Sequence, residues 1–379
     1  MVKKSKKRVA ITSAVIASPH FSWAKQSRSG SQNLSPNVFI KNENAYRSNN
    51  KTHKNTFLKS LSLLVIMIFG LINPVYALPF NGINQIYFFG DSLSDSGFND
   101  LLPGLPIGKA PSFTTFSGYT WTQYLAHDLK GYTLPVYPGP VPADTITNNS
   151  CCVIPGLSSG SLKGINYAAA GSRTNSPGIL ITQAPSLVTQ VQTFLNTPGR
   201  SIQSNDIFFI WEGANDLLGA ANPSDPPLVI FKKLSHAAKE ATDNIANQIA
   251  LLISKGAKRF VVLNLPDIGS TPYALSFGST KLSSRLTQIT FIFNSLLNQA
   301  LGRIIQQYGI QILEVNTPSI LTQLSSQFKN TTSPICGDLP SVACMNTSNG
   351  YLFADALHPT DMAHHLLAEQ VKSLILNWA

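Results

Sequence analysis

Charged residues and cysteines are both scarce in this chain. Only 12% of its 379 residues are Asp, Glu, Lys or Arg, and only four are cysteines. None of the four belongs to a Cys-x-x-Cys pair or has a histidine nearby at the spacing of a zinc site. The sequence therefore predicts no metal site, and nothing in it calls for an organic cofactor.

Acidic residues are almost absent from residues 1–77, which hold 12 Lys or Arg and one Asp or Glu. The rest of the chain holds 16 basic and 17 acidic residues, so the formal charge of +10 belongs to the N-terminal part. Because the remainder is nearly neutral, its charge gives no support for nucleic-acid binding.

A hydrophobic run long enough to span a bilayer comfortably is also missing from the N-terminal part. The apolar run there, residues 61–72, has only 12 residues. Lysines precede this run, and Val75-Tyr76-Ala77 follows it with small residues at positions −3 and −1 of a cleavage site. This layout is typical of a secretory signal peptide cut after Ala77, and a retained membrane anchor is the alternative.

Cleavage there would divide the chain into an N-terminal extension with its signal peptide, residues 1–77, and a single domain, residues 78–379. We therefore expect a secreted or periplasmic protein.

Disulfides form in such compartments, and four cysteines allow three pairings. We favour Cys336–Cys344, which would close a small loop. A Cys151–Cys152 bridge would be strained, so these two are expected to be partly free or paired elsewhere.

Short apolar runs alternate with longer segments that carry one apolar stripe at helical spacing. Continuous apolar strands separated by such helices indicate a parallel sheet that is buried on both faces. The pattern predicts a doubly wound, three-layer α/β/α fold with a five-stranded parallel sheet. The expected strands are Ile86–Phe89, Ile165–Ala168, Ile207–Trp211, Phe260–Leu265 and Ile310–Val315, and the expected helices cover 186–195, 235–254, 281–306 and 361–377.

Three Gly/Pro-rich segments interrupt this alternation, at residues 103–118, 131–164 and 316–352. They are longer than ordinary connections between helices and strands. Segments of this length are candidates for the walls or lids of an active site, and plain mobile surface loops are the alternative.

The first apolar run ends abruptly in Gly90-Asp91-Ser92. A buried strand that delivers a serine to its carboxyl end places it where ligands bind in open α/β sheets. Ser92 is therefore the candidate nucleophile. Asp91 and Asp95 flank it, and we expect them to cap the turn through side-chain to backbone hydrogen bonds.

A serine becomes a good nucleophile only when a base takes its proton. His358 is the best candidate base, because Asp355 lies three residues before it and could orient the imidazole. Pro359 keeps His358 out of helical geometry, at the mouth of the last helix. The other histidines after residue 77 lie within helical runs: His127, His236, His364 and His365.

Two further blocks stand between the serine and the histidine, Ala168-Ala169-Ala170-Gly171-Ser172 and Gly213-Ala214-Asn215-Asp216. With these four blocks, from about Ile86 to the C-terminus, the chain resembles the GDSL lipases and esterases, also called SGNH hydrolases. The family's block residues would be Ser92, Gly171, Asn215 and His358.

Two details refine the resemblance. Leu265–Pro272 is similar to the loop after the fourth strand in the bacterial lipase branch. Many relatives read Asp-x-Gly-Asn where this chain has Asp95-Ser96-Gly97-Phe98-Asn99, which leaves the role of Asn99 open.

The resemblance implies a flavodoxin-like fold and a triad of Ser92, His358 and Asp355. It also implies an oxyanion hole formed by the backbone N–H groups of Ser92 and Gly171 and by the side-chain amide of Asn215. The bacterial secreted lysophospholipase, phospholipase A and acyltransferase branch implies a lipid ester substrate met transiently at a membrane surface. A sterol or another alcohol could accept the acyl group, and a protease could activate the enzyme by cutting a disulfide-bounded loop.

Two alternative functions remain at this point. A carbohydrate O-acetylesterase would use the same four blocks, and an exported binding protein could be built on a degenerate hydrolase fold.

Gly156-Leu157-Ser158-Ser159-Gly160 fits the Gly-x-Ser-x-Gly pattern of a nucleophile elbow. That pattern requires a strand before it and a helix after it, and neither is expected here, so we interpret it as a chance match.

Overall fold

The computed structural model describes residues 82–97, 113–115, 118–131, 165–178, 184–277, 280–337 and 350–378. All of them belong to one compact unit, Pro74–Ala379. Within these ranges no helix has both the length and the apolar character needed to cross a bilayer. Several predicted features lie outside the described residues: residues 1–77, Asn99, Cys151, Cys152, Gly156–Gly160 and Cys344.

The core of the fold is a four-stranded sheet with all strands parallel and in the order β1-β2-β3-β4. Its strands are β1 (Ile86–Gly90), β2 (Ile207–Trp211), β3 (Arg259–Leu263) and β4 (Gln311–Val315). All residues of β1 and β2 are buried. This burial explains why they read as continuous apolar runs, because a strand covered on both faces has no solvent side.

The predicted strand Ile165–Ala168 lies beside β1, as an isolated parallel bridge between Asn166 and Phe88. Two hydrogen bonds continue the pairing, from Tyr167 N–H to the Phe88 carbonyl (2.8 Å) and from Ala169 N–H to the Gly90 carbonyl (3.0 Å). With this segment on the outer side of β1, the sheet has the strand order 2-1-3-4-5 of flavodoxin-like folds.

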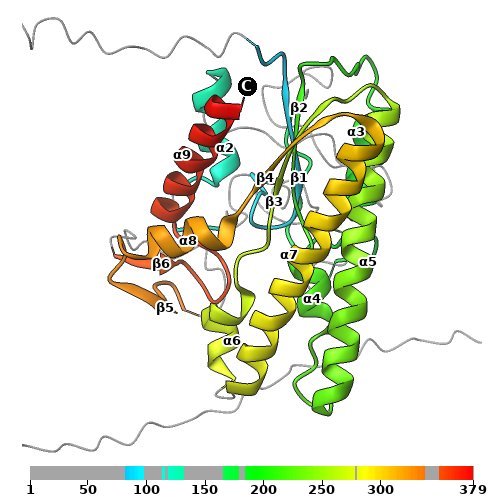
Figure 1. Ribbon diagram of the computed structural model, residues 1–379. Coiled ribbons are helices and arrows are strands. Elements are labelled where there is room, and N and C mark those ends of the chain that lie inside the picture. Colours follow the sequence, from blue (N-terminus) through cyan, green and yellow to red (C-terminus); the bar gives the residue numbers. More distant parts are fainter. Residues whose placement is uncertain are drawn as a thin grey trace, which may run out of the picture. The chain divides into compact units, whose positions relative to one another are not determined.

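Helices cover both faces of the sheet, which confirms the three-layer α/β/α fold (Figure 1). Neighbouring residues of β1 point to opposite layers. Phe88 meets the Trp121 ring edge-on at 5.6 Å, and Tyr87 meets the Phe194 ring at 4.7 Å. One layer holds α2 (Trp121–Lys130) and α9 (Asp361–Trp378), and the other holds α3 (Leu187–Asn196), α5 (Pro227–Ser254) and α7 (Thr280–Tyr308).

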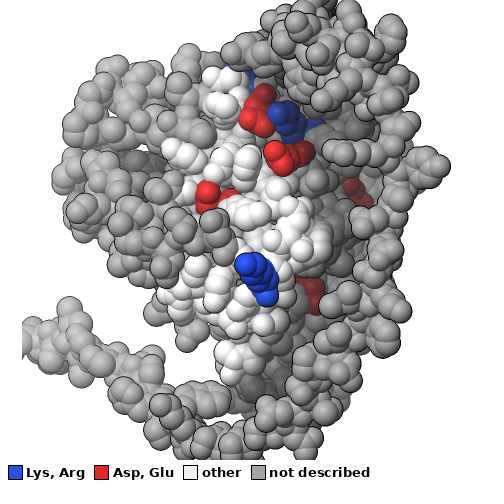
Figure 2. All heavy atoms as spheres, turned by 90° about the vertical axis from the view of Figure 1, so that its left-hand side faces the viewer, with Lys and Arg blue, Asp and Glu red and all other residues white. Residues whose placement is uncertain are grey.

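Charged side chains are thinly scattered over the described surface on the side of α2 and α9 (Figure 2). One ion pair joins these two helices there, between Lys372 and Asp128 at 2.8 Å. Exposed pairs of this kind contribute little to stability, so packing of the apolar stripes holds the layer to the sheet.

The interpretation of residues 316–352 as one Gly/Pro-rich loop was wrong over part of that range. The segment contains α8 (Thr317–Ser325) and β5 (Asn330–Pro334), and β5 pairs in parallel with β6 (Tyr351–Phe353). The Asn316 side chain accepts a hydrogen bond from Ser319 N–H, and Pro318 occupies the first turn. Proline fits that position, so here it marks the start of a helix instead of a loop.

Three short elements complete the described chain: α4 (Ala214–Ala220), a 3₁₀ turn at Ile268–Ser270 and α6 (Pro272–Ser276). The first follows the carboxyl end of β2, and the other two follow that of β3. These elements therefore lie at the edge of the sheet where a ligand is expected.

Candidate active site

The turn after β1 depends on close contact between two strand ends. A Cβ on Gly90 would lie 2.2 Å from the carbonyl oxygen of Trp211, so only glycine lets β1 and β2 stay paired up to this point. The next two residues, Asp91 and Ser92, leave the sheet at its carboxyl edge. This placement is the one that the sequence predicts for the nucleophile.

The two aspartates that flank the serine fix the turn around it. Asp91 Oδ1 accepts a hydrogen bond from Leu93 N–H at 2.9 Å. Asp95 accepts one from Gly97 N–H at 2.8 Å and another from Ala170 N–H at 2.9 Å. The predicted turn-capping role of both is confirmed. Asp95 also ties the serine block to the block that contains Gly171.

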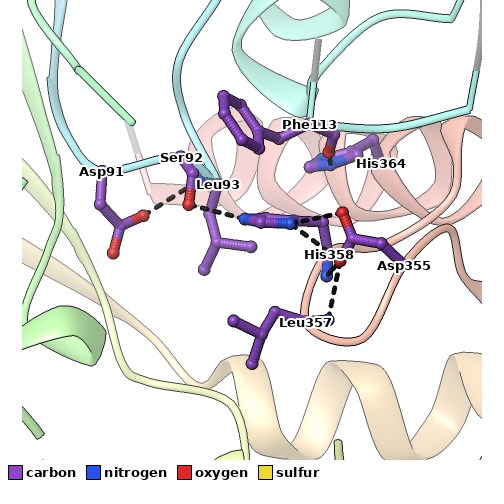
Figure 3. Close-up of polar contacts among 8 residues, drawn as sticks. All are labelled: Asp91, Ser92, Leu93, Phe113, Asp355, Leu357, His358 and His364. Atoms are coloured by element: carbon purple, nitrogen blue, oxygen red, sulfur yellow. Dashed lines mark hydrogen bonds and ion pairs between the residues drawn. The ribbon is translucent and has the colours of Figure 1, made fainter. Parts of the chain in front are cut away.

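Ser92, His358 and Asp355 lie in one line of hydrogen bonds (Figure 3). Ser92 Oγ is 2.8 Å from His358 Nε2, and His358 Nδ1 is 2.7 and 2.9 Å from the two oxygens of Asp355. All three side chains are buried. Residues 266 positions apart in the chain thus meet at one point.

The surroundings of Asp355 keep this carboxylate ionised. Burial by itself raises the pKa of Asp355, but the charge of His358 and hydrogen bonds outweigh it and hold the pKa below its usual value. The hydrogen bonds include those from the backbone N–H groups of Leu357 and His358, each 2.8 Å long. A carboxylate facing Nδ1 places the proton there and leaves Nε2 free to accept one from Ser92.

A tight turn between β6 and α9 presents the Asp–His pair. Ala354 N–H donates to the His358 carbonyl at 2.8 Å, and Pro359 forms an antiparallel bridge with Phe353. Helix α9 begins only at Asp361. His358 therefore sits just before the last helix, where Pro359 was expected to keep it.

The predicted oxyanion donors occupy neighbouring turns. Asn215 lies in the first turn of α4, and its amide donates to the Ser172 carbonyl at 2.8 Å. An amide nitrogen carries two hydrogens, so one remains for a ligand. Gly171, with φ of 78°, directly precedes Ser172. Ser92 and Asn215 line the cavity described below, whereas Gly171 is not among its lining residues.

Sequence analysis missed Gln190, whose buried side chain joins two of the blocks. Its amide bonds to both backbone groups of Gly90, accepting from N–H at 2.9 Å and donating to the carbonyl at 2.8 Å. It also donates to Ser172 Oγ at 3.0 Å. The available signal was a polar residue on the buried face of α3, between Leu187 and Val191.

Three carboxyl groups lie near the ends of β1 and β2: Asp91 and Glu212 are buried, and Asp216 is partly buried. Burial raises the pKa of Asp91 to about 7 and that of Asp216 to about 6. Burial also raises the pKa of Glu212 well above its usual range, and the charges of Asp91 and Asp216 add to the effect. Glu212 was missed as well, although an acidic residue directly after an apolar strand is an evident signal.

Among the described residues, no group of three or more potential ligands is arranged to hold a metal ion.

A cavity of about 550 Å³ opens beside Ser92 and His358. No Lys or Arg is found among the described residues that line it. Its apolar wall is built from several elements: Leu218 of α4, Leu275 of α6, Leu321 of α8, Leu352 and Phe353 of β6, and Leu367 of α9. Ser92 and His358 therefore lie at a largely apolar space that could hold a hydrocarbon chain.

Cys336, two residues after β5, is disulfide-bonded. Its partner lies outside the described residues, so pairing with Cys344 stays a prediction. The backbone N–H of Cys336 donates to the Ala354 carbonyl at 2.8 Å, next to the turn that carries Asp355 and His358.

Residues 86–371 match the family model of the GDSL-like lipases and acylhydrolases. The chain belongs to this family. The match includes all four blocks and both layers of helices, and the curated relatives include esterases and lipases. The protein is accordingly a GDSL-type carboxylic ester hydrolase.

Two relatives and one solved structure illustrate the likeness. "GDSL esterase/lipase APG" of Arabidopsis thaliana is 26% identical over 351 residues, which cover 83% of this chain and 94% of the relative. "Esterase EstA" of Pseudomonas aeruginosa is 27% identical over 77% of this chain, but only 47% of that longer protein is spanned. A crystal structure of a lipolytic G-D-S-L family member from Veillonella parvula superposes with a TM-score of 0.39 at 12% identity, covering 77% of this chain and 97% of the other.

Proposed function

We propose that this protein is a secreted serine hydrolase that cleaves acyl esters of lipids through Ser92, His358 and Asp355. The observation that carries the proposal is the 2.8 Å contact between Ser92 Oγ and His358 Nε2 at an apolar cavity. A nucleophile, a base and an orienting carboxylate in hydrogen-bond contact are what acyl transfer requires.

In the first half of the reaction, Ser92 Oγ attacks the ester carbonyl carbon while His358 Nε2 takes its proton. Asp355 stabilises the imidazolium that results. The carbonyl oxygen becomes negatively charged and is met by the backbone N–H groups of Ser92 and Gly171 and by the free amide hydrogen of Asn215. His358 then gives its proton to the alkoxide oxygen of the departing alcohol, and the acyl group stays on Ser92.

In the second half, a water molecule attacks the acyl-enzyme and His358 takes a proton from it. Collapse of the intermediate releases the fatty acid and returns the proton to Ser92. An alcohol such as a sterol could replace the water, because it offers the same O–H group. Acyl transfer would then form a new ester by the same steps.

The apolar cavity supports a lipid substrate, and phospholipids or lysophospholipids are the proposed class. A hydrocarbon chain gains about 0.8 kcal/mol for each CH₂ group that it buries, which favours long acyl chains over acetate in such a space. A preference for acetylated sugars would contradict this part of the proposal and support the O-acetylesterase alternative.

We also propose that residues 1–77 direct export and that Cys336 pairs with Cys344 in the oxidising compartment. The disulfide loop would lie close to the catalytic turn, since Cys336 N–H bonds to Ala354. A protease that cuts this loop could then alter access to the site. The support is the layout of residues 61–77 and the bonded state of Cys336.

The direct test is the Ser92→Ala variant, which should lose ester hydrolysis and labelling by a fluorophosphonate probe while keeping its melting temperature. The Asn215→Ala variant should still be labelled by the fluorophosphonate probe. It should turn over substrate about 10²–10³-fold more slowly, with KM less affected, because one oxyanion donor is lost. The substrates are a lysophospholipid, a diacyl phospholipid, short-chain nitrophenyl esters and an acetylated sugar, with and without a sterol. Folded Ser92→Ala with wild-type turnover would refute the proposed nucleophile.

A further inference from the structure

His364, on the second turn of α9, is fully buried and joins three segments of the chain. Its Nδ1 lies 3.2 Å from the backbone nitrogen of Trp121, at the start of α2, and its Nε2 lies 3.3 Å from the carbonyl oxygen of Phe113. Trp121 N–H can only donate, so Nδ1 must be the acceptor. The proton therefore sits on Nε2, which donates to Phe113. These two partners require the neutral ring.

The segment that contains Phe113 is also tied to the N-terminus of α9. Asp361 N–H donates to Thr115 Oγ1 at 3.1 Å, and Asp361 Oδ1 accepts from Tyr119 N–H at 2.8 Å. Together with the bond from His364, these contacts hold the described residues between 113 and 119 against the helix that follows the catalytic turn. We call residues 113–115 and 118–119 the strap.

The side chain at the start of the strap lies on the catalytic base. The Phe113 ring packs against the His358 imidazole with 4.8 Å between ring centroids and 52° between their planes. Phe113 is 7% exposed. Figure 3 shows Phe113 on one side of the imidazole, with His364 beside the Phe113 carbonyl. Asp355 and Ser92 contact the two ring nitrogens of His358, and Phe113 adds a contact on the face of the ring.

We propose that Phe113 is a positioning residue for the His358 imidazole and that His364 holds Phe113 in place through the strap. The contact keeps Nε2 directed at Ser92 and keeps water from that face of the ring. The electron-rich face of a phenyl ring also favours the imidazolium that forms when His358 takes the proton. This inference rests on the proposed function, in which His358 is the base.

The first experiment compares Phe113→Ala with Phe113→Leu and with a matched control, Phe328→Ala. Phe328 is as buried, at 8% exposed, but among the described residues no ring contact joins it to His358, as one joins Phe113. Phe113→Ala should lower kcat and the rate of fluorophosphonate labelling about 10- to 100-fold with little change in KM, because a misplaced base costs that much. Phe113→Leu should recover most of the rate, and Phe328→Ala should lower only the melting temperature.

The second experiment uses His364→Gln and His364→Leu. A glutamine amide can accept from Trp121 N–H and donate to the Phe113 carbonyl, so this variant should keep most of kcat. Leucine leaves both backbone groups unpaired, and its kcat should fall as in Phe113→Ala.

A folded Phe113→Ala protein with wild-type kcat, or losses in Phe113→Ala and Phe328→Ala that match each other, would overturn the role of Phe113. Folded His364→Leu with wild-type kcat, or equal losses in its Gln and Leu variants, would overturn the role of His364. Ser92→Ala serves as the reference in the same assay. If that variant keeps its activity, the proposed function fails; if it is inactive while Phe113→Ala is normal, only the present inference fails.

Discussion

Glu212 is a buried residue whose raised pKa makes stability depend on pH. Its side chain is 1% exposed, and burial raises its pKa well above the ordinary value of 4.5. In the unfolded chain the same group ionises near that ordinary value. At pH values above this ordinary pKa, ionisation of Glu212 stabilises the unfolded state but not the folded state. The free energy of unfolding therefore falls as pH rises, by up to about 1.4 kcal/mol per pH unit.

The variant Glu212→Gln carries no titrating group at this position. We therefore expect the free energy of unfolding of the variant, relative to wild type, to increase from pH 5 to pH 7, by up to about 1.4 kcal/mol per unit. Urea denaturation at each pH measures this difference. Asp355 and His364, whose lowered pKa values make stability fall toward acid pH, contribute equally to both proteins and cancel, whereas Asp91 and Asp216, whose charges act on Glu212, contribute to the difference.

The control for this measurement is Glu240→Gln, since the Glu240 side chain is 57% exposed. Its effect on stability should vary little with pH. A difference between Glu212→Gln and wild type that stays constant from pH 5 to pH 7 would contradict a raised pKa at Glu212.

For single residues, the sequence predicts a role where that role depends on neighbours in the chain. Ser92 follows a buried strand, and Asp355 lies three residues before His358, so both could be picked out by spacing. Gln190 and His364 could not, because their partners lie 100 and 243 residues away and both sit on helices whose buried stripes look like ordinary core.

Among the elements, α8 shows how a sequence signal can be misread. Proline and the polar residues around it favoured a loop over 316–352, yet Asn316 and Pro318 begin a helix. The error concealed the source of part of the cavity wall, because Leu321 of α8 lines it. Strands and long helices were predicted better, since their apolar periodicity is repeated over many residues.

Leu321 allows a test of what the cavity binds. Leu321→Trp would fill part of the space, so kcat/KM for a long-chain nitrophenyl ester should fall about 10-fold or more while a short-chain ester is little affected. A series of esters of increasing chain length measures this. Leu374→Trp, at an α9 position that is 38% exposed, is the control.

Equal losses of kcat/KM at every chain length would contradict the assignment of the cavity to the acyl chain. They would indicate instead that the tryptophan disturbs the catalytic turn. An unchanged chain-length profile in a folded Leu321→Trp protein would count against the assignment in the same way.

For the whole molecule, the parallel sheet determines where the site can be. The residues after β1, β2 and β3 and the turn before α9 all reach one edge, which follows from the strand order. Sequence patterns predicted the strands and the layers. They could not predict the small β5–β6 sheet, because β5 reads Asn-Thr-Thr-Ser-Pro and has no buried residue and no apolar pattern.

The distribution of charge over the whole chain leads to the remaining prediction. Of the 28 basic residues, 12 lie in residues 1–77, and the rest of the chain holds 16 basic and 17 acidic residues. If residues 61–77 act as a signal peptide, the exported protein should begin near Leu78 and carry a formal charge of −1 instead of +10. N-terminal sequencing and isoelectric focusing of secreted material measure both properties. An exported protein that still contains residues 61–72 would contradict cleavage there, and the basic segment would then remain part of the enzyme at the membrane surface.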